Sequence, residues 1–139
     1  MAYWLIKSEP ETWSWDQQVK RGAKGEHWDG VRNYQARNNM RAMKKGDRCL
    51  FYHSGSAREV VGVVEVIREA YPDPTATEGD WDCVDVKAVA PFAAPVTLAQ
   101  VKADSKLKDM VLVNNSRLSV QPVTGAEWAR VCKLGAFKG

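Results

Sequence analysis

Residues that build disulfide frameworks, metal centres and most active sites are scarce in this sequence. Its three cysteines are widely spaced and form no CxxC pair, which excludes a zinc ribbon and a disulfide scaffold. With two histidines and no HExxH, GxSxG or glycine-rich phosphate-loop motif, the chain carries none of the common catalytic signatures. We therefore expect no metal, no cofactor and no enzymatic activity.

Long apolar segments are absent as well. No stretch could span a bilayer, and the short apolar run at residues 3–6 lacks the basic region and cleavage site of a secretion signal. We therefore predict a cytoplasmic protein with reduced thiols and no membrane partner. Its 139 residues, 45% hydrophobic and 27% charged, are typical of one globular domain that spans residues 1–139. The sequence does not indicate an oligomeric state.

Charge is unevenly distributed along the chain, although its net value is only +3. Residues 1–58 carry 11 Lys or Arg against 6 Asp or Glu, residues 59–85 carry 1 against 8, and residues 86–139 carry 8 against 3. A basic surface opposite an acidic ribbon can orient a protein on a polyanion. Ordinary solvated faces are the alternative, which composition alone leaves open.

Capping residues and apolar periodicity mark the expected helices. Thr12 or Ser14 is placed to cap a short helix that ends near residue 20. The clearest helix follows Asn33 as its cap and runs to Lys45, with Ala36, Met40 and Met43 facing the core. A basic stripe repeats at the same spacing along this helix, at Arg37, Arg41 and Lys44. Shorter helices are predicted at 98–103 and 126–134.

Valine-rich runs predict the strands, which dominate the chain. They cover residues 3–6, 48–53, 59–69, 83–90 and 110–113, and the proline-containing segments at 71–74 and 91–95 are expected to be loops. Strands with short helices at the margins predict an α+β fold. A strongly bent mixed β-sheet or partial barrel, flanked by those helices, would leave few open edges.

The segment Trp28–Asn33 is the most informative part of the sequence. Trp28 is one of six tryptophans and stands on an irregular segment just before a helix, where it is well placed to form the wall of a pocket. Asn33 adds hydrogen-bonding groups at the helix start. A flat ring beside a mixed polar edge is what an extruded base requires. A buried tryptophan followed by a structural cap is the alternative.

Other polar residues lie at predicted strand ends. Ser8 could reach the polar edge of a ligand, and His53 could hydrogen-bond a base or phosphate. Arg117, among small polar residues, suits a phosphate or a base edge. Ordinary turns and a satisfied structural histidine are the alternatives. A catalytic dyad of His53 with Glu9 or Ser8 can be drawn, but nothing in the spacing favours it.

Together these segments resemble the EVE domain of the PUA-like superfamily, the family of the thymocyte nuclear proteins. The matching stretches follow the family's order and span essentially the whole chain, at Tyr3–Pro10, Trp28–Asn38, Phe51–Ser54, Glu69–Asp73, Val84–Val86 and Arg117–Pro122. The resemblance implies a curved sheet with a cleft near the first strand's end and the central helix's start. It also implies recognition of modified bases, with modified cytosine in DNA as the leading ligand class. The EVE domain is similar to the YTH domain, which holds a methylated adenine in an aromatic cage.

Residue roles follow from this resemblance. It implies Trp28 as the wall of the base pocket, with Ser8, Asn33, His53 and Ser54 at its edge. Contacts with the nucleic-acid backbone would come from Lys7, Arg32, Arg37 and Arg117. The chain departs from the family in lacking the basic N-terminal extension of the nuclear animal members, so a nuclear location is not inherited. The loop after Asp73 is also short.

The sequence thus favours a non-enzymatic domain that reads a modified base in DNA or RNA. The alternatives are an enzyme acting on a modified base or nucleotide, a binder of modified RNA, and a binder of a small free metabolite.

Overall fold

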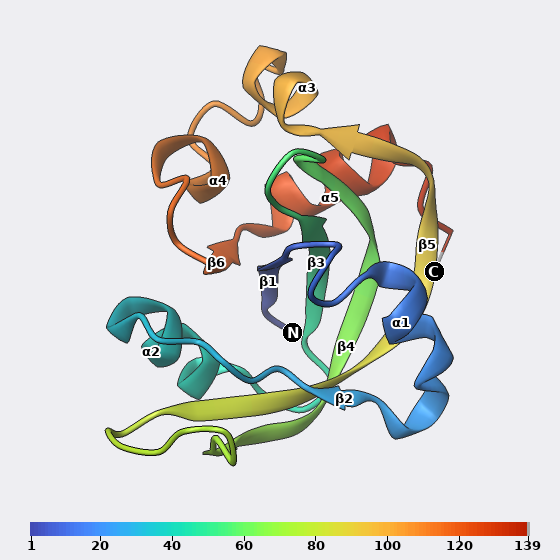
Figure 1. Cartoon of the computed structure of the whole chain (residues 1–139). Coiled ribbons are helices and arrows are strands. Elements are labelled where there is room, and N and C mark those ends of the chain that lie inside the picture. The colour runs from blue at the N-terminus through green and yellow to red at the C-terminus, as the bar shows by residue number, and fades with distance from the viewer. Residues whose placement is uncertain (139) are drawn as a thin grey trace.

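One six-stranded mixed sheet organises residues 1–138, the part of the chain that the computed structural model describes (Figure 1). The strands are β1 (Tyr3–Ser8), β2 (Glu26–His27), β3 (Arg48–His53), β4 (Glu59–Pro72), β5 (Asp82–Thr97) and β6 (Val120–Val123). Their order is β2-β5-β4-β3-β1-β6, and β1 and β3 form the one parallel pair of this sheet. The sheet is bent but not closed, which confirms the predicted α+β fold.

Short helices lie around this sheet. They are α1 (Trp15–Lys20), α2 (Tyr34–Ala42), α3 (Leu98–Ala103), α4 (Val111–Asn114) and α5 (Gly125–Leu134), with a 3-10 turn at Gly22–Lys24. The predicted caps of the first two are confirmed, because the Ser14 side chain accepts from the Gln17 N–H and that of Asn33 from the Ala36 N–H. None of these helices is long and apolar enough to cross a membrane.

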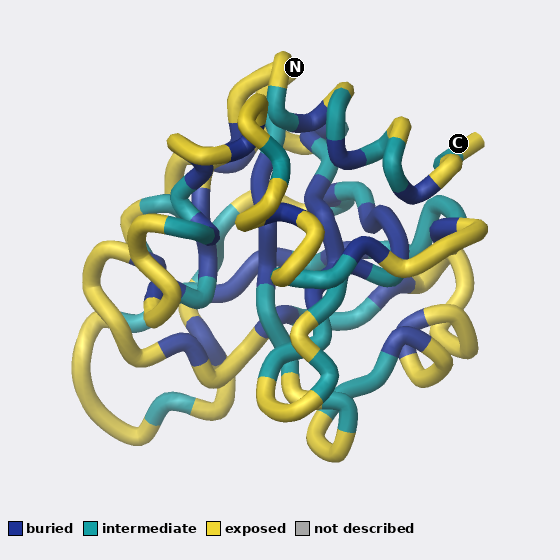
Figure 2. The backbone as a smooth tube through the Cα atoms, turned by 90° about the horizontal axis from the view of Figure 1, so that it is seen from above, coloured by how far each residue is buried: buried dark blue, intermediate teal, exposed yellow. Residues whose placement is uncertain are grey.

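The central strands are buried on both faces of the sheet. Successive side chains of a strand point to opposite faces, so Ile6 and Phe51 join one apolar cluster, while Leu5 and Leu50 join the other. Figure 2 shows the resulting concentration of buried backbone at the centre of the molecule. Because β1 and β3 are parallel, their C-terminal ends reach the same edge of the sheet, and Ser8 lies beside His53 there.

The long hairpin of β4 and β5 differs from the expected strands. The predicted loop at 91–95 is wrong, because β5 continues through Pro91 and Pro95 to Thr97. Along β5, β2 pairs only with residues 85 and 86, so no strand pairs with the far side of β5 at either proline. A proline on an unpaired side removes no ladder hydrogen bond.

Two further expectations are corrected by the structure. The predicted strand at 110–113 is wrong, because α4 covers residues 111–114. An apolar run of only four residues is too short to show the periodicity that distinguishes a strand from a helix. Helix α2 ends at Ala42 instead of Lys45. The N–H groups of Lys44 and Lys45 donate to the carboxylates of Asp47 (3.0 Å) and Glu69 (3.1 Å), which replace the helical acceptors.

Candidate functional site

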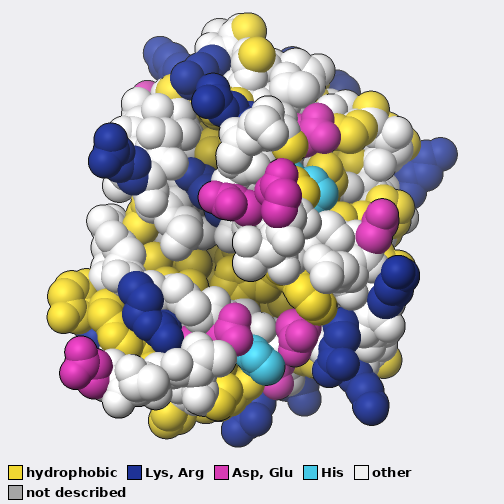
Figure 3. All heavy atoms as spheres, viewed as in Figure 1, with side chains coloured by type: hydrophobic (Ala, Val, Ile, Leu, Met, Phe, Trp, Pro, Cys, Tyr) yellow, Lys and Arg dark blue, Asp and Glu magenta, His cyan; other side chains and the backbone are white. Residues whose placement is uncertain are grey.

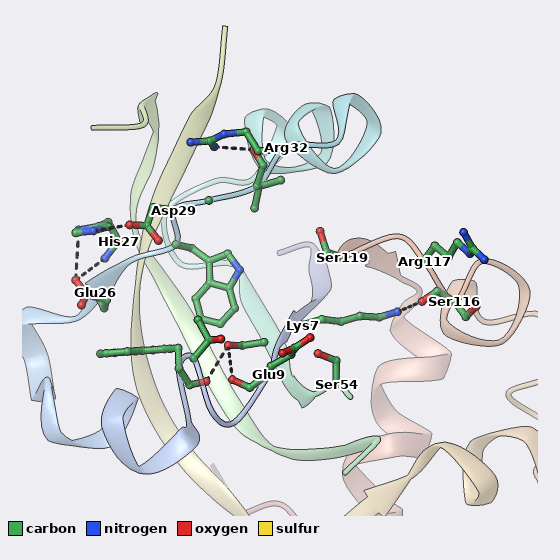
Figure 4. Close-up of a pocket in the computed structure, with 16 residues that line it drawn as sticks. Lys7, Glu9, Glu26, His27, Asp29, Arg32, Ser54, Ser116, Arg117 and Ser119 are labelled. Carbon is green, nitrogen blue, oxygen red and sulfur yellow. Dashed lines mark hydrogen bonds and ion pairs between the residues drawn. The ribbon is translucent and has the colours of Figure 1, made fainter. Parts of the chain in front are cut away.

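A cavity of about 680 Å³ opens where the end of β1 meets the segment between β2 and α2 and the loop before β6. We call it the first cavity. Figure 3 shows a hollow with hydrophobic side chains at its floor and charged side chains of both signs around it, and Figure 4 shows the lining residues. These are Lys7, Ser8, Glu9, Thr12, Trp13, Glu26, His27, Trp28, Asp29, Gly30, Val31, Arg32, Ser54, Ser116, Arg117 and Ser119.

The end of β1 connects the walls of the first cavity. The Lys7 N–H donates to the Ser119 carbonyl (3.0 Å), and the Ser54 N–H donates to the Ser8 carbonyl (2.9 Å). The Lys7 ammonium donates to the carbonyl of Ser116, and the Ser8 hydroxyl donates to that of Trp13 (2.8 Å). Because β1 pairs with β3 on one side and with β6 on the other, these bonds hold the polar rim at a rigid strand end.

The segment between β2 and α2 forms the opposite wall. The Trp28 N–H donates to the Val84 carbonyl (2.7 Å), and the buried carboxylate of Asp73 accepts from the Gly30 N–H (2.9 Å) and the Arg32 guanidinium (3.0 Å). Burial acts to raise the pKa of Asp73, but hydrogen bonds from Thr75, Gly30 and Arg32 outweigh it and lower this pKa to about 2. The carboxylate is thus a fixed negative charge that anchors the wall.

Trp28 combines the two roles that the sequence left as alternatives. The residue is only 7% exposed, and its side chain packs edge-on against Phe51, with the ring centroids 5.5 Å apart, inside one of the two apolar clusters. It also lines the first cavity. The indole therefore supports the core and gives the cavity an aromatic surface.

Carboxylates line the first cavity as well as cations. His27 lies between Glu26 (3.3 Å from Nδ1) and Asp29 (3.0 Å from Nε2), as the dashed lines in Figure 4 show. Glu9 lies on the other side, near Ser54 in the same view. Carboxylate oxygens accept hydrogen bonds from amino groups such as the exocyclic amine of cytosine. The cavity therefore offers acceptors, donors and an aromatic ring together.

Several residues expected at the site do line the first cavity. Ser8, Trp28 and Ser54 are among the expected base-contacting residues, and Lys7, Arg32 and Arg117 are among the expected backbone-contacting ones. The Arg32 guanidinium is bound to Asp73, whereas Arg117 makes no ion pair within residues 1–138. In Figure 4 the Arg117 side chain extends away from the cavity at its margin.

Three expected residues lie outside the lining of the first cavity. Asn33 uses its side-chain oxygen to cap α2. His53 accepts a hydrogen bond at Nε2 from the Trp15 N–H (3.1 Å), and burial lowers the pKa of His53, so the ring is neutral at pH 7. Arg37 stacks on Tyr34 and donates to the Asp80 carbonyl (3.0 Å). All three hold structure near the cavity.

The basic stripe on α2 is paired with the acidic β4–β5 loop. Arg41 contacts the carboxylates of Asp82 (2.6 Å) and Asp80 (2.9 Å), and Trp81 stacks on Tyr34 with ring centroids 5.0 Å apart. Charges that the sequence separates into blocks are therefore brought together in space. Arg41 has its charge balanced before any ligand arrives.

The described residues include neither a metal-binding cluster nor an activated thiol. No group of three or more His, Cys, Asp or Glu in residues 1–138 could hold a metal ion. Burial raises the pKa of Cys83 and Cys132 to about 11 and also raises that of Cys49, which keeps all three thiols protonated at neutral pH. Of the two acid–base candidates that the sequence offered, Glu9 lines the first cavity and His53 lies outside it.

Sequence reasoning missed several lining residues. Glu26 and His27 stand just before the segment Trp28–Asn33 and Asp29 stands within it, but they were assigned no role. Thr12 and Trp13 were considered only as part of a turn and helix start. The anchoring role of Asp73 has no local signal. It depends on a contact with residues 43 positions earlier in the chain.

The bent mixed sheet and the cavity at the end of its parallel pair define a domain of the PUA-like class. A model of the EVE domain matches residues 2–134, and the chain belongs to the EVE domain family. Human thymocyte nuclear protein 1 is 35% identical to it over 165 residues, which cover 96% of this chain and 73% of that protein.

Solved structures of similar proteins share this fold. A crystal structure of a protein from Agrobacterium tumefaciens is 56% identical, with a TM-score of 0.95 over 97% of this chain and 93% of that one. The structure of human THYN1 protein in complex with DNA containing 5-methylcytosine is 34% identical, with a TM-score of 0.90 over 100% of both chains. A YTH domain from Zygosaccharomyces rouxii, at 18% identity and a TM-score of 0.60 over 99% of this chain and 88% of that one, shares the fold.

Proposed function

We propose that this protein reads a modified nucleobase, with modified cytosine in DNA as the leading ligand, and performs no chemistry on it. The observation that carries the proposal is the first cavity, where the Trp28 ring, carboxylate acceptors and cations meet in about 680 Å³. Stacking of a base on an aromatic side chain contributes roughly 1–3 kcal/mol. The human relative that was solved with DNA containing 5-methylcytosine supports the same ligand class.

Roles within the first cavity follow from position. Trp28 provides the aromatic surface, and the hydroxyl of Ser54, which makes no hydrogen bond within residues 1–138, provides a free polar group. Ser8 is held by Trp13 and contributes at the edge. Lys7 and Arg117 contact the phosphate backbone, while Arg32 and Arg37 are bound to Asp73 and to the Asp80 carbonyl and contribute through long-range charge. Asn33 and His53 position the elements around the cavity.

Binding to matched oligonucleotides tests this function. Duplexes that differ only in a central cytosine, 5-methylcytosine or 5-hydroxymethylcytosine, and single-stranded RNA equivalents, would be titrated calorimetrically. One methyl group in an apolar niche is worth about 1 kcal/mol, so we expect 5-methylcytosine to be preferred by about tenfold or less. A hydroxyl that pairs with Ser54 would change the ranking further.

A serine pair in one turn provides the control for this experiment. Ser54→Ala removes a hydroxyl from the cavity, whereas Ser56→Ala removes one from an exposed position outside it. We expect only Ser54→Ala to reduce the difference between hydroxymethylated and methylated duplexes. Equal affinity of the wild-type protein for every base contradicts the reader function. If mass spectrometry finds that the bound base has been chemically altered, the protein is an enzyme that acts on the base and not a reader.

The cytoplasmic location expected from the sequence stays a prediction.

A further inference from the structure

A second cavity of about 400 Å³ adjoins the first one. Both are lined by Lys7, Ser54 and Ser116, so the two spaces adjoin at these residues. The second cavity lies between the β3–β4 turn and helices α3 and α4, and its other lining residues are Tyr52, Gly55, Arg58, Leu98, Lys102 and Leu112. It thus contains three cations and, unlike the first cavity, no carboxylate.

The charges of the three cations of the second cavity are not balanced by carboxylates of the described chain. Within residues 1–138, neither Lys7 nor Arg58 nor Lys102 forms an ion pair, whereas Arg32, Arg41 and Arg130 do. Lys7 lies over the Tyr52 ring, 5.6 Å from its centroid, and burial lowers the pKa of its ammonium. Bringing an anion close to Lys7 would compensate for this loss of hydration.

Arg58 lines this cavity, and its backbone adopts an uncommon conformation. Its φ of 51° lies in the left-handed region, which is unfavourable for a residue other than glycine. The Arg58 carbonyl accepts from the Leu98 N–H (2.9 Å), and its guanidinium Nε donates to the Gly55 carbonyl (3.1 Å). These bonds fix the guanidinium over the turn and leave its terminal nitrogens available to an anion.

We propose that the second cavity binds a phosphodiester group of the same strand whose base occupies the first cavity. Lys7, at the boundary of the two spaces, would contact this phosphate together with Arg58 and Lys102. A guanidinium and two ammonium groups, with no carboxylate in the lining, suit a phosphate, which offers several acceptor oxygens around one charge. The inference rests on the proposed function, because it assumes that a nucleotide fills the first cavity.

A double variant tests the phosphate site. Arg58→Gln with Lys102→Gln would be compared with a control of the same charge change outside both cavities, Lys20→Gln with Lys133→Gln. Affinity for duplexes with central cytosine or 5-methylcytosine would be measured between 50 and 300 mM salt. Each phosphate contact contributes roughly 0.9 to the slope of log affinity against log salt. We expect the slope to flatten by about one or two in the test variant and less in the control.

The ratio of the affinities for 5-methylcytosine and cytosine reports on the proposed function, whereas the salt slope reports on the phosphate site, so the two tests can fail independently. We expect the test variant to bind both duplexes more weakly with an unchanged ratio, and to melt at the same temperature as the control. An unchanged slope, or a lost ratio with the slope retained, overturns the phosphate site. A wild-type protein that shows no preference overturns the reader function instead.

Binding of small ligands shows whether the second cavity takes a phosphate of the nucleic-acid strand or free inorganic phosphate. In wild-type protein, 5-methyl-2′-deoxycytidine 3′,5′-bisphosphate should bind more tightly than the nucleoside, and Arg58→Gln with Lys102→Gln should abolish the difference. Inorganic phosphate alone should compete weakly. If it competes as well as the bisphosphate does, the second cavity is a free-anion site and the proposal is wrong.

Discussion

Asp73 is the residue on which the wall of the first cavity depends. Its side chain is buried and accepts hydrogen bonds from Gly30, Arg32 and Thr75, which lower its pKa to about 2. The unfolded chain has a value near 3.9, so the ionised form stabilises the fold above about pH 4, and this contribution is lost as the pH falls through about 2.

Replacing Asp73 by asparagine therefore gives a pH-dependent loss of stability. We expect Asp73→Asn to lower the free energy of unfolding by about 2 kcal/mol at pH 7, and the difference from wild type to shrink between pH 4 and pH 2. Urea unfolding at several pH values measures this. Glu78→Gln, an exposed change in the same loop, is the matched control. A loss that is equal at pH 7 and pH 2 would contradict the charge-based explanation.

At the residue scale, the sequence predicted which side chains line the first cavity better than it predicted their contacts. Trp28 and Ser8 were singled out because they stand before a cap and at a strand end, where local pattern is informative, and Ser54 was implied by the resemblance to the EVE family. Asn33 was also recognised as a cap, but a side chain that caps a helix has little left to offer a ligand. Whether His53 faced the cavity or Trp15 depended on tertiary contacts that no local pattern encodes.

At the scale of elements, α2 and the β4–β5 loop are joined by charge and by stacking. Arg41 contacts Asp80 and Asp82, and Tyr34, 66% exposed, stacks on Trp81. The sequence presented the helix stripe as a candidate track for phosphates. Since Arg41 is already paired, releasing it to a phosphate would break two ion pairs.

Arg41→Gln should therefore destabilise the β4–β5 loop without weakening the affinity for nucleic acid. We expect faster amide hydrogen exchange over residues 73–82 and an unchanged salt dependence of binding. Lys44→Gln on the same stripe makes no such contact and should leave the exchange unchanged. A slope that flattens by about one unit in Arg41→Gln would instead show that Arg41 turns to a phosphate on binding.

Helices that begin at a capping residue were predicted with nearly correct bounds. Strands whose length depends on the neighbouring strands were not. Residues 15–20, 98–103 and 125–134 are helical and begin after Ser14, Thr97 and Thr124, whose side chains accept the hydrogen bonds of a capping box. By contrast, the length of β5 depends on β4 beside it and on the open side of the strand at Pro91. Sequence periodicity contains neither fact.

At the scale of the whole molecule, the folded chain sorts its charges into paired and unpaired sets. Four carboxylates of the acidic segment 59–85 pair with cations of the described chain, since Asp73 binds Arg32, Asp80 and Asp82 bind Arg41, and Glu65 lies 3.8 Å from Lys87. The cations that line the two cavities and make no ion pair within residues 1–138 come from the two basic segments, at Lys7, Arg58, Lys102 and Arg117. A net charge of +3 therefore understates the attraction of this face for a polyanion.

The number of unpaired cations at the cavities sets the expected salt dependence of wild-type binding. If all four contact phosphates, the slope of log affinity against log salt on duplex DNA is about −3 to −4, at roughly −0.9 per contact. Fluorescence anisotropy with a labelled duplex containing one 5-methylcytosine, from 50 to 300 mM salt, measures it. The free nucleoside, which carries no phosphate, should bind with almost no slope.

A duplex slope near zero would mean that the cations do not face the backbone and would favour a small uncharged metabolite as the ligand. A slope steeper than about −6 would mean that more of the basic surface, including cations now paired with the acidic loop, is rearranged to reach the DNA.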